Sequence, residues 1–428
     1  AVLVGNASDE AKSWARAEVA KGKLTEDNML RIFEALAEAS EGESKPFPKT
    51  SPLTYVTRST RVVFARSAWE DDASWGAFLC PPRLVPDHQH VDAGNWVMTR
   101  GKDDLVVDPT PYEGTLSTQT GNAPAVDSDV MPEGQRPSQQ WSSLLGKEDL
   151  VWTRAFDGGL AVSRGNYADA FRHNEEPSDV PLALRDWIFV PNGKNVATVI
   201  VDRIETGAAK RGAHLRVRTK PALTLDGSVA KGSTGSSTVY VNQVYASSGT
   251  SSVRSIPEGD CPYTDDHGTC DAARFTVGEV KIDLKGPSVQ SIVVADGVAK
   301  DSAMPASRVS DGDGYRVVDL AREGVHVAVV VAKNVDPKRA TFTYVGPKGA
   351  THVVLDAPTG EGGRSDVTAT PSADGCTIVV TPHAGTEGGS LGRPLVVDVG
   401  HTCGAKEKGE VAIGVDPGTG LPATPADG

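Results

Sequence analysis

The sequence has no run of 18 or more apolar residues, so we expect no membrane span. Basic residues are also few: 43 Lys and Arg stand against 56 Asp and Glu, which gives a formal net charge of −13. Nucleic acids are bound by clustered basic surfaces, so an acidic chain of this kind is not expected to bind them. The nucleophile-elbow and phosphate-loop patterns are absent as well, and no repeat of fixed period occurs.

Cysteine is scarce, with five in 428 residues, and no pair has the C-x-x-C spacing of zinc knuckles or thioredoxin-like sites. Cys261 and Cys270 bracket a short polar loop, and Cys376 and Cys403 flank two strand-like runs. We therefore predict two local disulfides in a secreted protein, extracellular or periplasmic. Cys80 is then left over, either as a buried thiol or as a partner of another segment. No signal peptide stands at the start, so an export signal is expected upstream.

What the sequence does contain indicates a turn-rich, largely β chain. It has 45 Gly and 28 Pro, and its 39% hydrophobic residues are enough for a sizeable core. Only the beginning carries a helical pattern: Ser8 marks one helix start, and Thr25 caps a second amphipathic helix. We predict a helical segment over residues 1–45, whose two short helices resemble the tail of a larger helical domain.

After a Pro-rich breaker, the hydrophobic periodicity changes from helical to two. Strand-like runs such as RVVFARS, WIFVP, VATVIVDRI and VHVAVVVA follow one another, with turn signals such as NGK and DGDG between them. We therefore predict a mainly β fold, a large stacked antiparallel β-sandwich over residues 46–404. Residues 405–428 have the composition of a linker-like tail.

The most informative stretch is DHQHVD, residues 87–92, which holds two imidazoles and two carboxylates just before a predicted strand. In an extended backbone His88 and His90 point to the same face. Such a pair, with carboxylates nearby, is suited to metal binding or to proton transfer near neutral pH. A polar strand edge is the plain alternative for an H-x-H pattern.

Together with its surroundings, this stretch resembles the β-domain of the heparinase II/III-like polysaccharide lyases, a family that includes oligo-alginate lyases. The resemblance covers roughly residues 1–230 and rests on the order and spacing of several motifs. These motifs are YVTRSTRVVFARSAWEDDASW (55–75), DHQHVDAGNW (87–96), LVVDPTPY (105–112), Gly121-Asn122, EGQRP (133–137), VIVDRI (199–204) and LTLDG (223–227).

The resemblance implies an α/α-toroid followed by a stacked antiparallel β-sandwich, with a polysaccharide cleft between them. It implies cleavage of a uronic-acid polysaccharide by β-elimination, with His88 as a catalytic residue in the cleft. It also implies that His90 and Asp108 are ligands of a structural zinc ion. The family's third zinc ligand is a histidine, often followed by Asn. Gly121-Asn122 stands in that context here, so we expect zinc to bind weakly or not at all.

The toroid is where the sequence departs from the family, because residues 1–45 are too few to form it. That domain normally supplies the remaining catalytic groups. We therefore expect as partner a helical toroid domain or chain from the same precursor. It would dock on residues 1–45, where Leu30, Phe33 and Leu36 have no other helical layer to bury them.

Three further residues are candidate substrate contacts. Tyr112, in PTPYEG, either reaches the cleft or packs within its own turn. Asn95 and Arg100 flank the strand that follows the two histidines. The forked donors of Arg100 are suited to a substrate carboxylate, or else to a salt bridge with an acidic residue of the next turn.

One basic stretch stands out in the acidic chain. Its members are Lys210, Arg211, His214, Arg216, Arg218 and Lys220. On a strand, the alternate positions from 214 to 220 share one face. This face is either a ridge for a polyanionic sugar or an ordinary solvated sheet face.

These observations favour the β-domain half of a secreted polysaccharide lyase whose partner is an acidic polysaccharide. The alternative is a catalytically silent carbohydrate-binding or cell-surface structural subunit on the same scaffold. The intact spacing from DHQH to Asp108 favours the enzyme, whereas the missing histidine and the missing toroid favour the silent subunit. A third hypothesis is a β-rich adhesin in which the H-x-H match is accidental.

Overall fold

In the computed structural model, the chain forms two compact units, Ala1–Pro52 and Leu53–Gly428. The described residues are 8–20, 45, 49, 51–57, 60–81, 90–108, 118, 121–133, 137–139, 149–155, 157–173, 176–255, 278–311, 315–322, 325–332, 339–345, 351–358, 367–371, 377–382, 395–398 and 410–413.

The described part of the first unit consists mainly of helix α2 (Asp9–Ala20). The predicted start is confirmed, because the Ser8 hydroxyl accepts a hydrogen bond of 3.1 Å from the backbone N–H of Ala11 and so caps the first turn. The predicted second helix, with its apolar residues, lies outside the described residues. No helix in the described part of the chain is long and apolar enough to cross a membrane.

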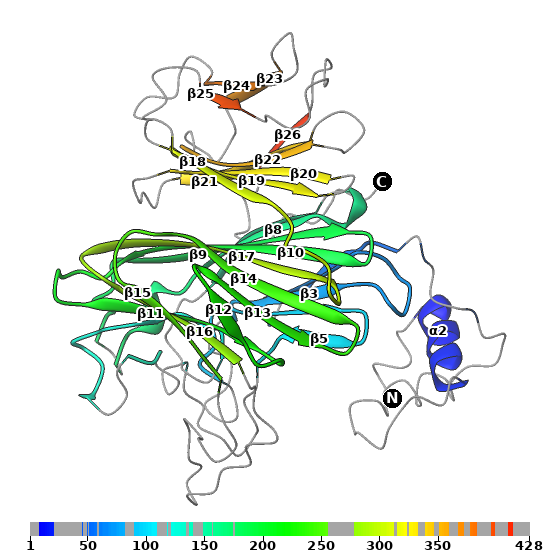
Figure 1. Ribbon diagram of the computed structural model, residues 1–428, viewed down its shortest axis with the longest axis horizontal. Helices are drawn as coiled ribbons and strands as arrows, with labels where there is room; N and C mark the ends of the chain where they lie inside the picture. Colours follow the sequence, from blue (N-terminus) through cyan, green and yellow to red (C-terminus); the bar gives the residue numbers. More distant parts are fainter. Residues whose placement is uncertain are drawn as a thin grey trace, which may run out of the picture. The chain divides into compact units, whose positions relative to one another are not determined.

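Sheet 1, the first sheet of the second unit, is antiparallel throughout (Figure 1). Its strands, in spatial order, are β1 (Thr54–Val56), β2 (Val62–Arg66), β3 (Trp75–Leu79), β4 (Asn95–Arg100), β5 (Asp103–Val106), β11 (Gly212–Thr219), β16 (Gly278–Lys285) and β15 (Thr250–Ser255). A two-residue strand, β6 (Ala125–Val126), also pairs with β11.

Sheet 2 is antiparallel too, and its central strands are 11 or 12 residues long. In spatial order it contains β12 (Thr224–Asp226), β13 (Val229–Thr234), β14 (Ser237–Ala246), β17 (Ser288–Ala299), β10 (Asn195–Glu205), β9 (Leu182–Asn192), β8 (Ala161–Asn166) and β7 (Asp149–Ala155). Two short 3-10 helices, η3 (Asp157–Gly159) and η4 (Ala168–Ala170), lie on either side of β8 in the sequence.

Sheet 3 differs from the first two because it contains a parallel pair, β20 with β22. Its order is β18 (Ser307–Asp311), β19 (Tyr315–Arg322), β20 (Val325–Ala332), β22 (Thr351–Pro358), β21 (Arg339–Val345) and β26 (Glu410–Ile413). A three-stranded sheet contains β23 (Val367–Pro371), β24 (Thr377–Pro382) and β25 (Leu395–Asp398).

Strand β26 lies inside residues 405–428, where the composition predicted a linker-like tail. The short run EVAI pairs with β21 over four residues, because even a brief apolar run can complete the hydrogen bonds of an exposed sheet edge.

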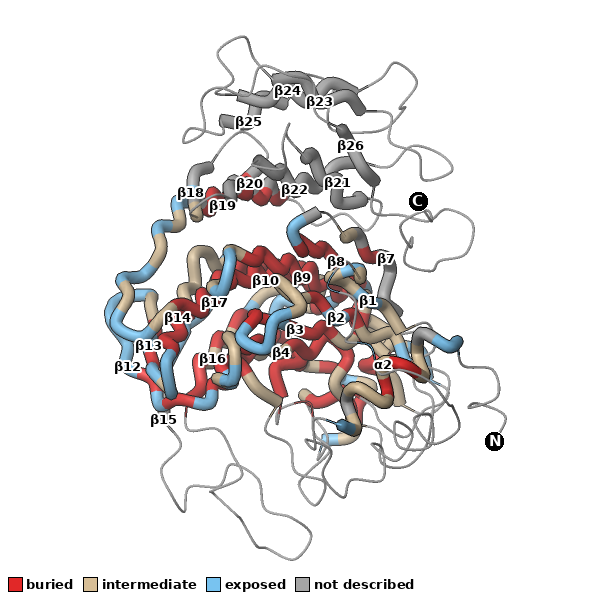
Figure 2. Tube along the Cα trace, turned by 90° about the vertical axis from the view of Figure 1, so that its right-hand side faces the viewer, coloured by how far each residue is buried: buried red, intermediate tan, exposed pale blue. Residues whose placement is uncertain are grey.

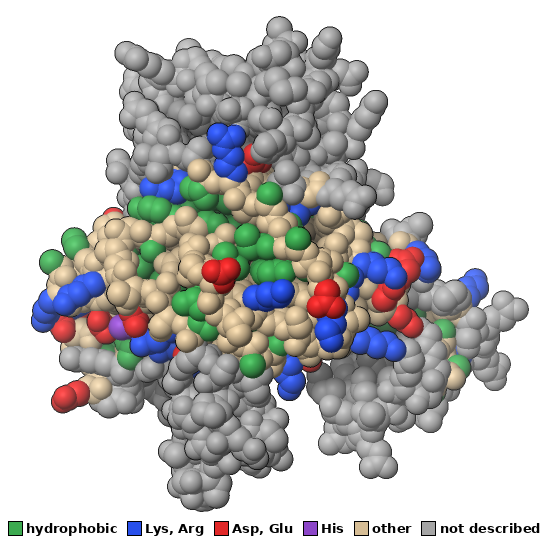
Figure 3. All heavy atoms as spheres, in the orientation of Figure 1, with side chains coloured by type: hydrophobic (Ala, Val, Ile, Leu, Met, Phe, Trp, Pro, Cys, Tyr) green, Lys and Arg blue, Asp and Glu red, His purple; other side chains and the backbone are tan. Residues whose placement is uncertain are grey.

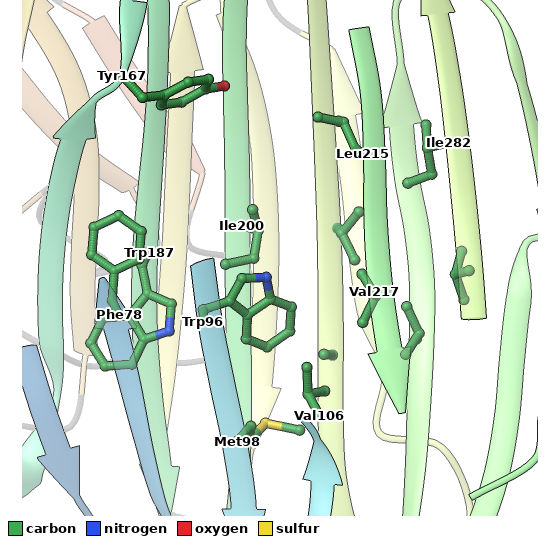
Figure 4. Packing of buried hydrophobic residues seen from close by; sticks show 14 of the residues in the cluster. Phe78, Trp96, Met98, Val106, Tyr167, Trp187, Ile200, Leu215, Val217 and Ile282 are labelled. Carbon is green, nitrogen blue, oxygen red and sulfur yellow. The ribbon is translucent and has the colours of Figure 1, made fainter. Parts of the chain in front are cut away.

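Sheet 2 is buried on both faces, which explains why its strands read as continuous apolar runs. Alternate residues of β9 and β10 belong to two hydrophobic cores. Trp187 and Ile200 pack with Trp96 and Met98 of sheet 1 in the first core (Figure 4). In the second core, residues of β9, β10 and β17 pack with those of β19 and β20 of sheet 3. Buried positions accordingly run through the central strands (Figure 2). The predicted stacked, mainly antiparallel β fold is confirmed.

Candidate functional site

The sequence placed the candidate site immediately before β4, and the structure describes the second half of that segment, from His90 onward. His90 is half-buried, and β4 begins five residues later at Asn95. His88 and Tyr112 lie outside the described residues, so their catalytic and substrate-binding roles stay predictions.

The backbone that follows His90 is held by two buried side chains from distant parts of the chain. The Thr118 hydroxyl donates a 2.7 Å hydrogen bond to the carbonyl of Val91. The Gln139 amide both accepts from the N–H of Ala93 (3.1 Å) and donates to its carbonyl (2.8 Å). These two residues are also bonded to each other, since the N–H of Gln139 donates to the Thr118 hydroxyl at 2.9 Å. Residues 91–93 are therefore fixed although they form no regular element.

A tight turn closes this segment onto β4. The N–H of Asn95 donates to the carbonyl of Asp92 at 2.9 Å, and Gly94 takes a positive φ of 89°. A Cβ at Gly94 would lie 2.9 Å from Cδ of Pro124, so the position needs glycine for its conformation and for its space.

Asn95, predicted as a substrate contact, is fully buried and ties three strand ends together. Its amide nitrogen donates to the Asp108 carboxylate at 2.7 Å, and its oxygen accepts from the N–H groups of Trp96 and Asn122, both at 2.9 Å. A Cβ at Gly121 would come within 3.2 to 3.3 Å of Asn95 and Asp108, which explains the small residue there. The structure thus brings Asn95, Asp108 and the Gly121-Asn122 turn together.

Arg185 of β9 joins this arrangement to sheet 2. Its guanidinium donates to both oxygens of Asp202 (2.7 and 2.9 Å), and its remaining nitrogen donates to the carbonyls of Gly94 (2.8 Å) and Asn122 (2.6 Å). Burial alone would lower the pKa of Arg185, but the Asp202 carboxylate outweighs it and raises the pKa. Burial, together with Asp202, also raises the pKa of the nearby Tyr167 well above its ordinary value. Arg185 therefore stays charged and Tyr167 stays neutral near neutral pH, and Arg185 acts as a positioning residue.

We call this set the anchor cluster. It consists of Asn95, Asp108, Thr118, Asn122, Gln139, Arg185 and Asp202. Asn95, Asp108 and Asn122 were singled out from the sequence, and Asp202 lies within the VIVDRI motif, whereas Thr118, Gln139 and Arg185 were not expected. The EGQRP motif drew attention to Gln135, whereas the glutamine that bonds the backbone of Ala93 is Gln139. Nothing in the local sequence marks Thr118 or Arg185 as special.

The described residues do not fit a closed zinc site, which needs about four ligands. They contain no group of three or more His, Cys, Asp or Glu side chains that could hold a metal ion. Gly121 stands where the resemblance would place the histidine, and it has no side chain to offer. The following Asn122 is already engaged: its amide donates to the carbonyls of Trp96 and Val107 and accepts from the N–H of Arg218. The predicted ligands His90 and Asp108 are therefore left without a third ligand from this turn.

Arg100 lies at the opposite end of β4 from Asn95, about 17 Å away along the strand. Its guanidinium donates to the Asn195 side chain at 3.0 Å and to the Ser237 hydroxyl at 3.2 Å. The structure therefore does not bring Arg100 to the anchor cluster, and its role as a substrate contact stays a prediction.

The basic stretch forms β11 and the residues beside it. Its three arginines are buried and His214 is half-buried, whereas Lys210 and Lys220 at the two ends are exposed. Its pairs are Arg211 with Asp129 and Asp179, His214 with Asp127 and Asp283, and Arg218 with Glu279. Burial acts to raise the pKa of Asp283, but hydrogen bonds from His214 and Lys281 outweigh it and lower that pKa. Elsewhere too, basic and acidic side chains are interspersed on the face seen in Figure 3.

The predicted disulfides involve four cysteines that all lie outside the described residues. Cys80, left over in that prediction, is fully buried, and its sulfur lies 3.7 Å from the carbonyl oxygen of Asn166. The reading of Cys80 as a buried thiol is therefore the correct one of the two alternatives.

No protein-family model matches the chain, and no curated protein does. Among solved structures, the chain is similar to a heparinase III (the BT4657 gene product), with a TM-score of 0.49 and 14% identity over 76% of this chain and 47% of that one. It is also similar to the heparan sulfate lyase HepC from Pedobacter heparinus, with a TM-score of 0.48 and 12% identity over 77% and 49% of the two chains. The chain thus spans about half the length of these structures, and the likeness is one of fold.

Proposed function

We propose that this chain is the β-sheet half of an exported polysaccharide lyase that cleaves an acidic, uronate-containing polysaccharide by β-elimination. The rest of the site would lie on a helical toroid outside this chain. The observation that carries the proposal is the anchor cluster. Buried side chains from three separate segments, Thr118, Gln139 and Arg185, fix the backbone that directly follows the two histidines.

The cost of this arrangement is the reason to read it as functional. Burying an arginine and its aspartate removes both from water and stabilises a fold less than apolar side chains of similar size would. Here the pair holds two loop carbonyls, those of Gly94 and Asn122, in place. A reacting imidazole gains from such support, because a small displacement of a catalytic group lowers the rate sharply.

In the proposed reaction, His88 takes part in proton transfer at the carbon beside the uronate carboxylate. Imidazole is the group in DHQHVD that exchanges protons near pH 7 without a large pKa shift. The negative charge that develops on the carboxylate must be stabilised, and the leaving glycosidic oxygen must be protonated, by groups on the toroid. A zinc ion, where bound, would be held by His90 and Asp108 and would support the segment that carries His88. No step depends on it.

The test follows unsaturated uronate products by ultraviolet absorbance, with heparan sulfate, alginate and polygalacturonate as substrates. The sample is the chain together with its helical partner, and the variants are His88→Ala and, as a histidine control on β20 of sheet 3, His326→Ala. We expect turnover of at least one polymer, its loss in His88→Ala, and its retention in His326→Ala. Undiminished turnover in His88→Ala would remove this residue from the mechanism. No product from any polymer would favour the silent carbohydrate-binding subunit.

A further inference from the structure

Exposed large hydrophobic side chains are not scattered evenly over the described surface. In the described part of the chain, six large hydrophobic side chains are exposed. Three of them lie on the neighbouring strands β1, β2 and β3: Tyr55 (66% exposed), Phe64 (42%) and Trp75 (37%). All three are aromatic. The other three, Leu225, Met304 and Val309, are aliphatic or thioether side chains at other places in the chain.

Strand register places the three aromatic residues on one face. Val63, Ala65 and Phe78 point into the first core, so the residues that alternate with them point to the opposite, outer face of sheet 1. Tyr55 is paired directly with Phe64, and Phe64 with Ala77. Trp75 lies two residues from Ala77 on the same face.

The row continues toward the candidate site. Ala77 is paired with Val97 of β4, so Tyr55, Phe64, Ala77 and Val97 form a row across four strands, about 14 Å long. Tyr55 and Phe64 are exposed, Val97 is half-buried and Ala77 is buried, so the open part of the row is its aromatic end. Val97 lies two residues, or about 7 Å, from Asn95 of the anchor cluster, and both point to the outer face. We call this row, with Trp75 beside it, the aromatic strip.

We propose that the aromatic strip binds pyranose rings of the same polysaccharide, as an extension of the site beside the anchor cluster. The proposal rests on the proposed function for the acidic nature of the sugar. Strands are about 4.8 Å apart, close to the length of one pyranose unit, so rings on neighbouring strands can stack on successive sugars. The cross-strand neighbour of Trp75 is Arg66, whose guanidinium stacks over the Trp69 ring at 4.4 Å and donates to the carbonyls of Ala68 and Glu70. Its positive charge thus lies at the edge of the strip, held by the protein's own groups.

The size of the strip favours a sugar over a protein partner. The three aromatic side chains together expose roughly 300 Å², if a whole aromatic side chain presents about 200 Å². A stable protein interface needs about 800 Å² on each partner. A short oligosaccharide lying on three rings needs much less.

The experiment measures binding apart from turnover, by calorimetric titration of the intact chain in a His88→Ala background. The probes are three hexasaccharides, prepared from heparan sulfate, alginate and polygalacturonate. We expect at least one to bind, and Phe64→Ala and Trp75→Ala to raise its Kd about three- to tenfold. Trp75→Phe should keep most of the affinity. Leu225→Ala, which removes an exposed side chain on β12, is the matched control and should leave Kd unchanged.

Several outcomes would overturn the proposal: no binding of any hexasaccharide at millimolar concentration, an unchanged Kd in both aromatic variants, or an equal loss in Leu225→Ala. If Phe64→Ala leaves the Kd for the hexasaccharide unchanged but loses a protein subunit that the unmodified chain binds, seen as a lower mass of the complex, the strip would be a protein interface instead. The proposed function fails separately. If the unmodified chain with its helical partner produces no unsaturated uronate while the aromatic variants lose affinity, the strip stands and the lyase proposal falls.

Discussion

Arg185 links the anchor cluster to sheet 2. Its five donors are fixed in a planar fork, and four hydrogen bonds join it to one carboxylate of sheet 2 and to two loop carbonyls beside sheet 1. A lysine could not reproduce this, because its single nitrogen cannot serve Asp202 in a bidentate manner and reach both carbonyls as well.

Replacing Arg185 with Met should lower the free energy of unfolding by about 3–5 kcal/mol, because Asp202 is left as a buried charge without its cation. Urea unfolding measures the change. The double variant Arg185→Met/Asp202→Leu should recover most of the loss, since no lone charge remains. Arg100→Met, at the partly exposed end of β4, is the control and should cost under about 1.5 kcal/mol. A loss in Arg185→Met no larger than in Arg100→Met would contradict the role given to this pair.

Asp186, the neighbour of Arg185 on β9, governs stability at acidic pH. Burial would raise the pKa of Asp186, but Arg164 and Arg203, at 2.6 and 2.9 Å, lower it from 3.8 to about 2. Because the pKa is lower in the folded state, the carboxylate stabilises the fold fully above about pH 4. That contribution, about 2 kcal/mol, is lost as pH falls toward 2.

The measurement is the free energy of unfolding between pH 2 and pH 5 for the unmodified chain and for Asp186→Asn. The variant should be less stable at pH 5, and its curve should fall less steeply toward pH 2, because the titrating group is gone. Parallel curves for the two proteins would show that Asp186 does not titrate in this range.

Among the elements, the turn that begins β4 is the one on which the candidate site depends most directly. Gly94→Ala should cost about 2–4 kcal/mol, because alanine is strained at a φ of 89° and its Cβ would meet the ring of Pro124 at 2.9 Å. Gly193→Ala measures the backbone strain alone. Gly193 also has a positive φ, 58°, but a Cβ there meets nothing within 4 Å. That control should cost about 1–2 kcal/mol. Equal losses in urea unfolding would mean that the contact with Pro124 does not matter.

Most of the strands could be predicted from sequence because their hydrophobic periodicity is strong. Runs such as VATVIVDRI and WIFVP became β10 and β9 of the doubly buried sheet 2. The missed strands carry weaker signals: β3 reads WGAFL, with glycine inside it, and β15 reads TSSVRS, with three serines. The parallel pairing of β20 with β22 could not be predicted, because strand alternation gives the buried face of a strand but not the identity or direction of its neighbour.

The candidate site, too, could be predicted from the sequence only in part. The two histidines were found because imidazoles at strand spacing, with carboxylates beside them, are a chemical signal in themselves. Asp108 was named only because the resemblance to the lyase family implied it. The side chains that hold this segment come from positions 27 to 91 residues away and are ordinary polar types. Only the folded chain shows that Thr118, Gln139 and Arg185 all hydrogen-bond to the backbone of one short segment, residues 91–94.

At the scale of the whole molecule, the second unit stacks three sheets and presents on sheet 1 both the anchor cluster and the aromatic strip. The chain spans about half the length of the solved heparinase structures to which it is similar. In the proposed function, a helical partner supplies the missing catalytic groups. The central claim is that the complete assembly cleaves a uronate polysaccharide by elimination and not by hydrolysis.

The mass of the products tests that claim most directly. The chain with its helical partner is incubated with heparan sulfate, alginate and polygalacturonate, and the fragments are measured by mass spectrometry. Elimination leaves an unsaturated uronate at the new non-reducing end, so each such fragment is lighter by one water molecule than the corresponding hydrolysis product. We predict these lighter fragments from at least one polymer and none from the His88→Ala assembly. Fragments with saturated ends, or intact polymers throughout, would contradict the assignment.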